Sequence, residues 1–455
     1  MRVRQFPSDE IRGALKVINK LFLPLLLLFG LGASPLAQTP TAEITGEVSD
    51  EAGAALPGAQ VTVRNVNTNA ARSIKTDDNG RFLVPQLPPG EYEIKVEQSG
   101  FNREIRQGVV LTVGREAVVN FSLKVGSISE QVVINQDASP VNTTSSEISA
   151  LIPERTIKNL PLNGRDLLQL ATLQIGVVNV GGLTDPSIES GTGANKLSIN
   201  GGRIDSNNFM LDGASVNEAQ NTTPGSAAGG FVGVDAVQEF QLLTNNYSAE
   251  YGGAGGGIVN IVSKSGSNEL HGTLFEFLRN SVFDARNFFD REEVPPFKRN
   301  QFGGSVGGPI RKDRTFIFGA YEGLQERLAK TQTFIVPTAE ARQGASPSMT
   351  PYLNLYPLPN AGGIGGGQGL FVRNDSNRTT ENFFAVRADH RLSDDDNFFA
   401  RYTFDDAEVV DHNGIITDAV LSSRNQYAGM EETHIFSPAL VNSARFAYNR
   451  SFVLG

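Results

Sequence analysis

The chain has 455 residues, of which 39% are hydrophobic and 19% charged, and its formal net charge is −10. A single hydrophobic core stops growing beyond roughly 250–300 residues, so this length predicts at least two domains. The sequence contains no cysteine, which excludes disulfides, thiolate metal sites, cysteine nucleophiles and the lipidated cysteine of a lipoprotein. The negative charge, without a cluster of Lys and Arg, argues against a nucleic-acid partner.

The N-terminus has the layout of a secretory signal peptide. Basic residues precede an apolar run over residues 21–31, and small residues follow up to Ala37. The run is about half as long as the ~20 residues that a transmembrane helix needs. We therefore predict a signal peptide over residues 1–37, with an exact cleavage site left open, and we expect any membrane insertion to be by β-strands.

Residues 41–124 show the pattern of a β-sandwich. Apolar and polar residues alternate in short runs, which predicts half-buried strands. Turn signals separate these runs, at residues 78–80 and 87–90. The motifs that punctuate this region resemble those of the carboxypeptidase regulatory-like domain; they cover residues 44–50, 76–82, 87–92 and 100–101. The resemblance implies a structural or binding module and not the peptidase, whose zinc ligands are missing.

A linker, residues 125–146, follows the sandwich. It contains an acidic residue and then a β-branched run, which can pair as an added strand with the sheet edge of a partner. The alternative is that this segment is a last strand or a plain linker of the sandwich. The candidate residues are Glu130, Gln131, Val132, Val133, Ile134 and Asn135.

Residues 147–264 mix short helices and strands. Asn163 precedes Asp166 at capping-box spacing, which predicts a short amphipathic helix ending near Gly176. Asp212 and Gly213 stand between two apolar runs, the strongest short-range signal for a hairpin.

From about residue 265 onward the segments alternate and have aromatic ends. Residues 387, 389 and 391 place charged side chains on one face, and residues 386, 388 and 392 place apolar side chains on the other. This pattern is typical of a membrane barrel with an apolar outer face and a polar lumen, although a soluble sandwich gives the same alternation.

Several ordered motifs resemble the plug of Oar-like TonB-dependent receptors; they cover residues 160–165, 207–213, 234–240, 245–252, 260–266 and 271–277. The resemblance implies a mainly β protein: an Ig-like or transthyretin-like sandwich, an α+β plug over residues 147–264, and a partial outer-membrane barrel over residues 265–455. It implies plug-motif roles for Asn163, Gly164, Arg165, Asp212 and Gly213, and it makes residues 130–135 the candidate TonB box.

The function that this resemblance implies is uptake of a ligand across the outer membrane. The expected partners are a TonB-like periplasmic energy-coupling protein, outer-membrane lipid, and an unidentified oligosaccharide, peptide or metal chelate. No cofactor, metal or catalytic residue is expected. The four histidines lack the spacing of a zinc site; they are His271, His390, His412 and His434.

Two other functions fit parts of the sequence. An exported adhesion or scaffold protein could bind carbohydrate or protein through its sandwich. A hydrolase could use Ser305, which stands in a Gly-x-Ser-x-Gly pattern, but that pattern requires a helix directly after the serine and the sequence continues as an alternating strand.

The number of residues left for the barrel is small. About 22 strands of 9–11 residues need roughly 220 residues before any loop is added, more than lie between residues 266 and 455. We therefore expect an N-terminal fragment that does not close a barrel and that exposes an unpaired strand edge.

Overall fold

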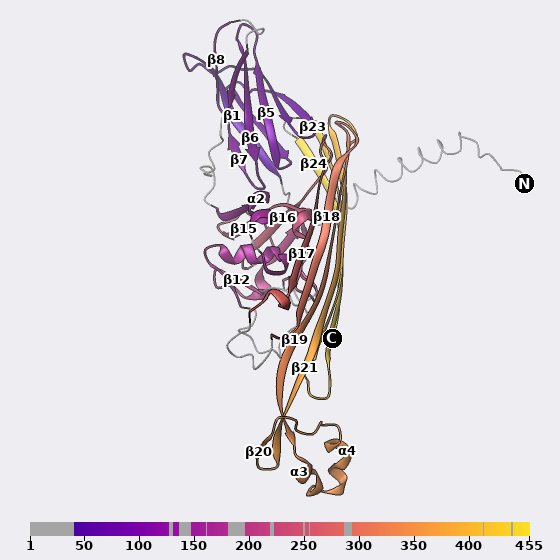
Figure 1. Cartoon of the computed structure of the whole chain (residues 1–455). Coiled ribbons are helices and arrows are strands. Elements are labelled where there is room, and N and C mark those ends of the chain that lie inside the picture. The colour runs from indigo at the N-terminus through magenta and orange to yellow at the C-terminus, as the bar shows by residue number, and fades with distance from the viewer. Residues whose placement is uncertain are drawn as a thin grey trace, which may run out of the picture.

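The computed structural model describes residues 41–126, 131–135, 147–160, 162–180, 196–218, 223–248, 251–253, 255–285, 294–412, 414–437 and 440–455. The predicted signal peptide lies outside them. The described residues form three parts that follow one another in the chain: a sandwich (residues 42–135), a plug (147–264) and a wall of long strands (271–454). The sandwich and the plug lie one above the other along the same side of the wall (Figure 1).

The sandwich consists of two sheets over one apolar core. In the first sheet the central strand β1 (Ala42–Asp50) pairs with three others, β4 (Arg81–Leu87), β7 (Glu116–Val118) and β8 (Phe121–Leu123). The second sheet has the order β3 (Ala71–Lys75), β2 (Gln60–Asn65), β5 (Gly90–Glu97), β6 (Arg103–Leu111) and β9 (Gln131–Asn135). Strand β5 shows why the sequence alternates, because Tyr92, Ile94 and Val96 point into the core and are at most 2% exposed.

The plug is built on a mixed sheet of five strands, in the order β10 (Ile148–Pro153), β15 (Val237–Asn245), β16 (Ile258–Ser263), β13 (Asn208–Leu211) and β14 (Ala214–Ser215). Strands β11 (Val177–Asn179) and β12 (Leu197–Ile199) form a separate pair. The helix α2 (Glu154–Asn159) follows β10 directly and buries Ile157. Side chains of the wall, including Phe318 and Tyr427, belong to the same apolar cluster as the plug core.

The predicted capping box is wrong in its details. Residues Asn163–Arg165 and Leu167–Leu173 form two short 3₁₀ helices, and Asp166 caps the second by accepting a hydrogen bond from the Leu168 N–H at 2.9 Å. Gly164 and Arg165 both have positive φ angles, of 67° and 54°, so the backbone cannot continue as one helix through them. The predicted apolar face is correct, since Leu167, Leu170 and Ala171 are buried.

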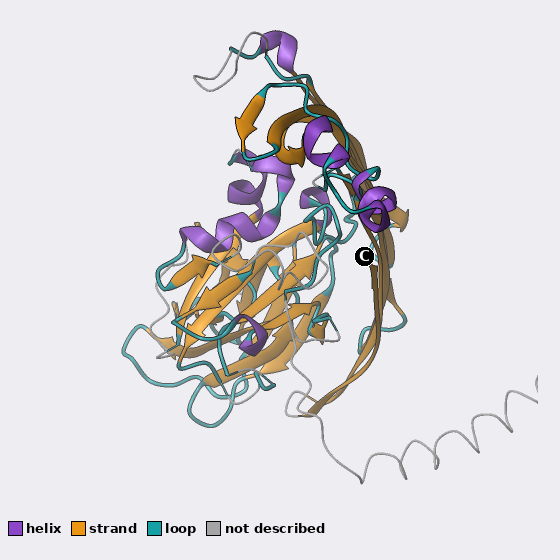
Figure 2. Ribbon diagram, turned by 90° about the horizontal axis from the view of Figure 1, so that it is seen from below, coloured by secondary structure: helices purple, strands orange, loops and turns teal. Residues whose placement is uncertain are grey.

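The wall is one antiparallel sheet of long strands, in the order β17 (His271–Asn280), β18 (Phe297–Arg311), β19 (Thr315–Pro337), β21 (Gln368–Arg391), β22 (Asp396–Asp411), β23 (Ala419–Ser437) and β24 (Leu440–Leu454). Its strands curve around the plug and the sandwich (Figure 2). Ser305 lies in the middle of β18, and its hydroxyl is 2.8 Å from that of Thr273 on β17. The strand-to-helix turn of a nucleophile elbow is therefore not formed there.

The connections of the wall differ at its two ends. At the end near the sandwich the turns are short, as between β18 and β19 and between β21 and β22. At the opposite end the connections are longer, and that between β19 and β21 contains α3 (Ala339–Gln343), α4 (Thr350–Leu353) and β20 (Gly363–Gly365). Among the described residues no helix combines the length and the apolar character of a membrane-spanning helix.

Candidate functional site

The contact between the plug and the wall is the candidate site, and Asp212 is its most buried charge. Asp212 and Gly213 form the predicted two-residue hairpin turn between β13 and β14, with φ angles of 48° and 75°. Such angles favour Gly and tolerate Asp, which explains the residue types at this turn. The turn projects the Asp212 carboxylate, which is 2% exposed, toward the wall.

Two arginines of the wall meet this carboxylate. Arg401 of β22 places Nε 2.6 Å from Asp212 Oδ2, and Arg387 of β21 places Nη1 3.4 Å from Oδ1. Within the plug, Ser263 donates to both carboxylate oxygens, from its N–H at 2.9 Å and its hydroxyl at 2.7 Å. Burial raises the pKa of Asp212, but Arg401, Arg387 and the Ser263 hydrogen bonds outweigh it and hold the pKa below its usual value. Asp212 is therefore a carboxylate at neutral pH.

The same turn makes backbone contacts with the wall. Arg401 Nη2 donates to the carbonyl of Leu211 at 2.6 Å, and Arg445 Nη1 donates to the carbonyl of Gly213 at 3.0 Å. Arg445 also pairs with Glu431 of the neighbouring strand. The ion pair holds the hairpin tip against the wall, and the hydrogen bonds fix its orientation, because each guanidinium carries several donors in a fixed geometry.

Arg165 makes a second contact between the plug and the wall. Its Nη2 lies 2.6 Å from Asp235 Oδ2 in the plug, and its Nε lies 3.1 Å from Glu322 Oε1 on β19. The guanidinium also stacks 4.0 Å from the ring centre of Phe275 on β17. Gln301 of β18 bonds both Glu322 Oε1 at 2.7 Å and the carbonyl of Gly164 at 3.2 Å. The side chain of Asn163 is outside what the structure describes.

A third contact involves a plug loop between residues 223 and 231. The Ser226 hydroxyl donates to Glu381 of β21 at 2.5 Å, and the Ala227 N–H donates to the Ser423 hydroxyl at 2.7 Å. Asn425 of β23 donates to the carbonyl of Gly225 at 2.9 Å. Added to the contacts of Asp212 and Arg165, these bonds attach the plug to the wall at three separated places.

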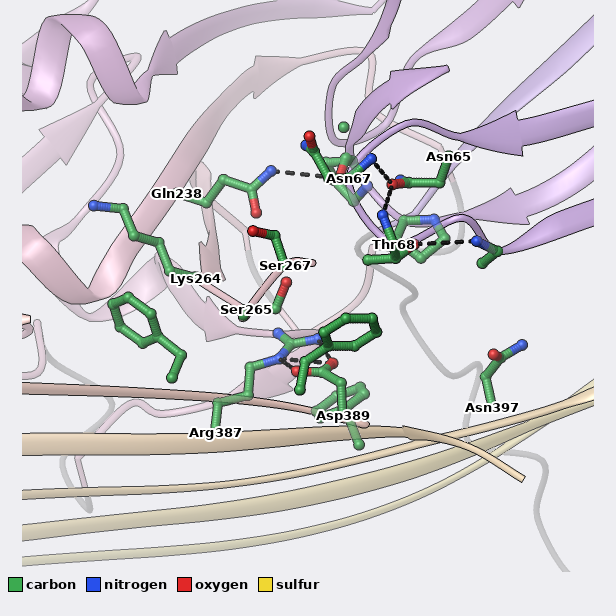
Figure 3. Close-up of a pocket in the computed structure, with 18 of the residues that line it drawn as sticks. Asn65, Asn67, Thr68, Gln238, Lys264, Ser265, Ser267, Arg387, Asp389 and Asn397 are labelled. Carbon is green, nitrogen blue, oxygen red and sulfur yellow. Dashed lines mark hydrogen bonds and ion pairs between the residues drawn. The ribbon is translucent and has the colours of Figure 1, made fainter. Parts of the chain in front are cut away.

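The sandwich contacts both the plug and the turns of the wall. The Val113 N–H donates to Glu239 of the plug at 2.6 Å, Asn69 donates to Asp313 in the turn between β18 and β19 at 2.8 Å, and Ser443 donates to Gln86 at 2.9 Å. A cavity of about 530 Å³ remains between the three parts. Figure 3 shows Asn65 and Asn67 of the sandwich on one side of it and Arg387 with Asp389 of the wall on another.

Residues 131–135 form strand β9, the last strand of the second sandwich sheet, and pair in parallel with β6. This is the arrangement that the alternative interpretation of the segment expects. An edge strand can also exchange its partner, so the coupling role stays a prediction. Glu130 lies outside the described residues, and of this strand's side chains only Val133 is described, at 48% exposed.

One histidine stands near two carboxylates. The carboxylate oxygens of Asp396 and Glu432 and an imidazole nitrogen of His434, which are the atoms that could hold a metal ion, lie within 4.8 Å of one another across β22 and β23. His434 is also hydrogen-bonded to Asp396. Spacing along the chain could not reveal this group, because its members meet only through strand pairing.

Glu239 makes the contact between sandwich and plug sensitive to pH. Burial raises its pKa to about 7, which the Val113 hydrogen bond only partly offsets. Between the ordinary value of 4.5 and about 7, the folded protein holds a proton that the unfolded chain has lost, so stability falls as the pH rises through this window. The unfolding free energy of the unchanged protein should therefore fall between pH 5 and pH 8. In Glu239→Gln we expect this fall to be smaller, by at most about 3 kcal/mol.

Urea unfolding at the two pH values measures this difference. Glu47→Gln, at an exposed position of β1, is the control and should keep the pH dependence of the unchanged protein. An unchanged pH dependence in Glu239→Gln would show that this carboxyl group is ionised in the folded protein at pH 5.

The sequence singled out the plug residues of this site and, among their partners in the wall, only Arg387. Arg387 was predicted to face inward, and it does, while Val386 on the opposite face is 39% exposed. Arg401, Glu322 and Glu381 were not predicted. One sequence feature could have revealed all three: each is a charged side chain at an inward position of an alternating strand.

Two family models match the chain. An outer membrane beta barrel domain matches residues 262–350 and 345–454, and a carboxypeptidase regulatory-like domain matches residues 43–124.

Two curated relatives match the chain across these regions. The TonB-dependent transporter Oar of Myxococcus xanthus is 29% identical over an alignment of 321 residues, which covers 66% of this chain and 28% of Oar. A probable TonB-dependent siderophore receptor, PirA of Acinetobacter baumannii, is 25% identical over an alignment of 206 residues, which covers 43% of this chain and 25% of PirA. The chain thus spans about a quarter of the length of these relatives.

Among solved structures, the outer membrane transporter YddB of Escherichia coli aligns with 67% of this chain and 39% of its own, at 12% identity and a TM-score of 0.46. The ferric enterobactin receptor PfeA of Pseudomonas aeruginosa aligns with 68% of this chain and 42% of its own, at 14% identity and a TM-score of 0.43.

Proposed function

Because the chain is a homologue of the Oar TonB-dependent transporter and is located in the outer membrane, we propose that it takes up a ligand through a plugged barrel with energy supplied from the periplasm. The observation that carries the proposal is the polar attachment of the plug to the wall through Asp212 and Arg165. These contacts are ion pairs and hydrogen bonds, which fix a position and can be exchanged for water or for one another when the plug moves.

The orientation of the chain supports this proposal. In outer-membrane barrels the short turns face the periplasm and the longer loops face the exterior. The sandwich and the segment 131–135 lie at the end with the short turns, where a periplasmic energy-coupling protein could reach them. The loop with α3 and α4 lies at the other end, where an external ligand arrives.

The other two interpretations receive less support. The relatives are named as a transporter and a receptor, not as enzymes or adhesion proteins. The candidate ligands are an oligosaccharide, a peptide and a metal chelate, and a ferric siderophore is the first probe to test because one relative is named as a probable siderophore receptor.

Replacing Val133 with proline tests the coupling part of the proposal. Proline removes a backbone N–H that strand addition uses, so we expect energised uptake to be lost while ligand binding persists. In the full-length receptor, uptake of a labelled ferric siderophore by cells, and its binding to isolated outer membranes, measure the two quantities. Val133→Ala keeps the N–H and should transport normally, whereas normal transport by Val133→Pro would return residues 131–135 to a purely structural role.

A further inference from the structure

The cavity of about 530 Å³ lies where the sandwich, the plug and the wall meet (Figure 3). Its volume is within the range of about 300–1,000 Å³ that small-molecule sites occupy in proteins. Each part of the chain supplies some of its lining: Asn67 comes from the sandwich, Ser265 from the segment that leaves the plug, and Asn397 from the wall. The cavity is therefore formed only when the three parts are assembled.

The charged side chains that line this cavity already have partners. Lys264 pairs with Glu154 at 3.1 Å. Arg387 pairs with Asp389 at 2.8 Å. Among the described residues, the other charged side chains of the lining are also held in ion pairs or in hydrogen bonds with neighbouring groups. A charged ligand would therefore find no unpaired counter-charge, and would have to break one of these pairs to gain one.

Three neutral polar side chains of the lining are free. Those of Asn67, Ser265 and Asn397 make no hydrogen bond with any described residue. An amide group and a hydroxyl group each donate and accept hydrogen bonds. These three side chains therefore suit an uncharged ligand whose own groups both donate and accept, which is the chemistry of a polyhydroxylated molecule.

Apolar surfaces stand beside these polar groups. Phe399 of β22 is half-buried and lines the cavity, and the Arg387 guanidinium lies 4.4 Å from its ring centre. Pro88 and Pro89 of the sandwich belong to the lining as well. A sugar ring has an apolar face of C–H groups and hydroxyl groups around its edge. It can therefore lay that face on an aromatic or proline ring and direct its hydroxyl groups to the free amides.

We infer that this cavity binds a short neutral oligosaccharide on the exit side of the plug. The cavity lies between the plug and the sandwich, toward the end of the wall with the short turns, which the proposed orientation places at the periplasm. The inference rests on the proposed function and deepens it, because it selects one of the candidate ligand classes. The sandwich then forms one face of a site that receives the ligand after it has passed the plug.

A single cysteine in the lining tests the inference, because the chain itself contains none. Ser265→Cys places a thiol at a half-buried position of the cavity, and the rate at which a maleimide labels it in the detergent-solubilised chain is measured. The probes are cellotriose and maltotriose, two neutral trisaccharides with different linkages, since three free side chains are too few to select one linkage. At about ten times its dissociation constant, either sugar should slow the labelling about tenfold, because only the unoccupied cavity reacts.

The matched control is Ser206→Cys, at a half-buried serine of the plug that does not line the cavity, and its labelling rate should not change. Trigalacturonic acid, a trisaccharide with three carboxylates, should protect neither thiol. Adding Asn397→Ala to Ser265→Cys removes one free amide and should raise the half-protecting concentration of both neutral sugars about two- to tenfold. Thr68→Cys, in the sandwich part of the lining, repeats the measurement from the opposite side of the cavity.

Unchanged labelling of both cavity thiols in the presence of the neutral sugars would overturn the inference. Equal protection by trigalacturonic acid, or protection by a ferric siderophore alone, would overturn the ligand class. Uptake by the full-length receptor is measured without these cysteines, so energised uptake of another ligand would leave the proposed function standing when the inference fails. Protection of the cavity thiols by sugars that the full-length receptor does not take up would contradict the proposed function instead.

Discussion

Asp212→Ala is expected to lower the unfolding free energy of the plug by about 3–5 kcal/mol, the usual cost of removing one partner of a buried ion pair. The variant leaves Arg401, whose side chain is 3% exposed, and Arg387 without the carboxylate between them. It also removes the acceptor for the Ser263 N–H and hydroxyl. Urea unfolding and the rate at which a protease cleaves the plug in isolated membranes measure the effect.

The control is Asp406→Ala, because Asp406 pairs with Arg424 in a half-exposed contact on the same strand as Arg401. Exposed pairs contribute at most about 1 kcal/mol, so this variant should unfold almost as the unchanged protein does. Adding Arg401→Met to Asp212→Ala removes one stranded cation and should recover part of the loss. If Asp212→Ala costs no more than Asp406→Ala, the hairpin contact does not hold the plug.

The sequence was most informative where local chemistry decides the structure. Asp212 and Gly213 supply the turn that a two-residue hairpin requires, and the hairpin forms as predicted. The alternating runs of residues 41–124 become the strands of the sandwich for the same reason. Local sequence does not predict what the hairpin tip contacts, since Arg387 lies 175 residues further along the chain than Asp212. Only the folded wall brings that side chain to the turn.

Other outcomes depended on competition between similar local signals. Asn163 and Asp166 both suit a helix N-terminus, and the positive φ of Gly164 and Arg165 decides in favour of Asp166. The segment 131–135 suits both an internal edge strand and a segment that pairs with a partner. The same residues suit both roles, so the sequence alone could not distinguish an internal edge strand from a segment that pairs with a partner.

The final prediction concerns Arg165, which binds a plug carboxylate and a wall carboxylate with one guanidinium. We expect Arg165→Ala to lower the unfolding free energy by about 2–4 kcal/mol, somewhat below the cost for full burial, because the side chain is 15% exposed. Arg165→Lys should recover less than half of this loss. A lysine ammonium is a point charge that lacks the planar fork needed to serve Asp235 and Glu322 together and to stack on Phe275.

A glycine at position 165 separates the side chain from the backbone. Arg165 has a φ of 54°, a conformation that costs a residue with a Cβ roughly 1 kcal/mol and costs glycine almost nothing. Arg165→Gly should therefore be about 1 kcal/mol more stable than Arg165→Ala and still well below the unchanged protein. The same urea unfolding series ranks the four proteins. If Arg165→Gly matched the unchanged protein, the contacts of the Arg165 side chain would contribute only about the 1 kcal/mol that relief of backbone strain returns, and they would not be a main attachment of the plug.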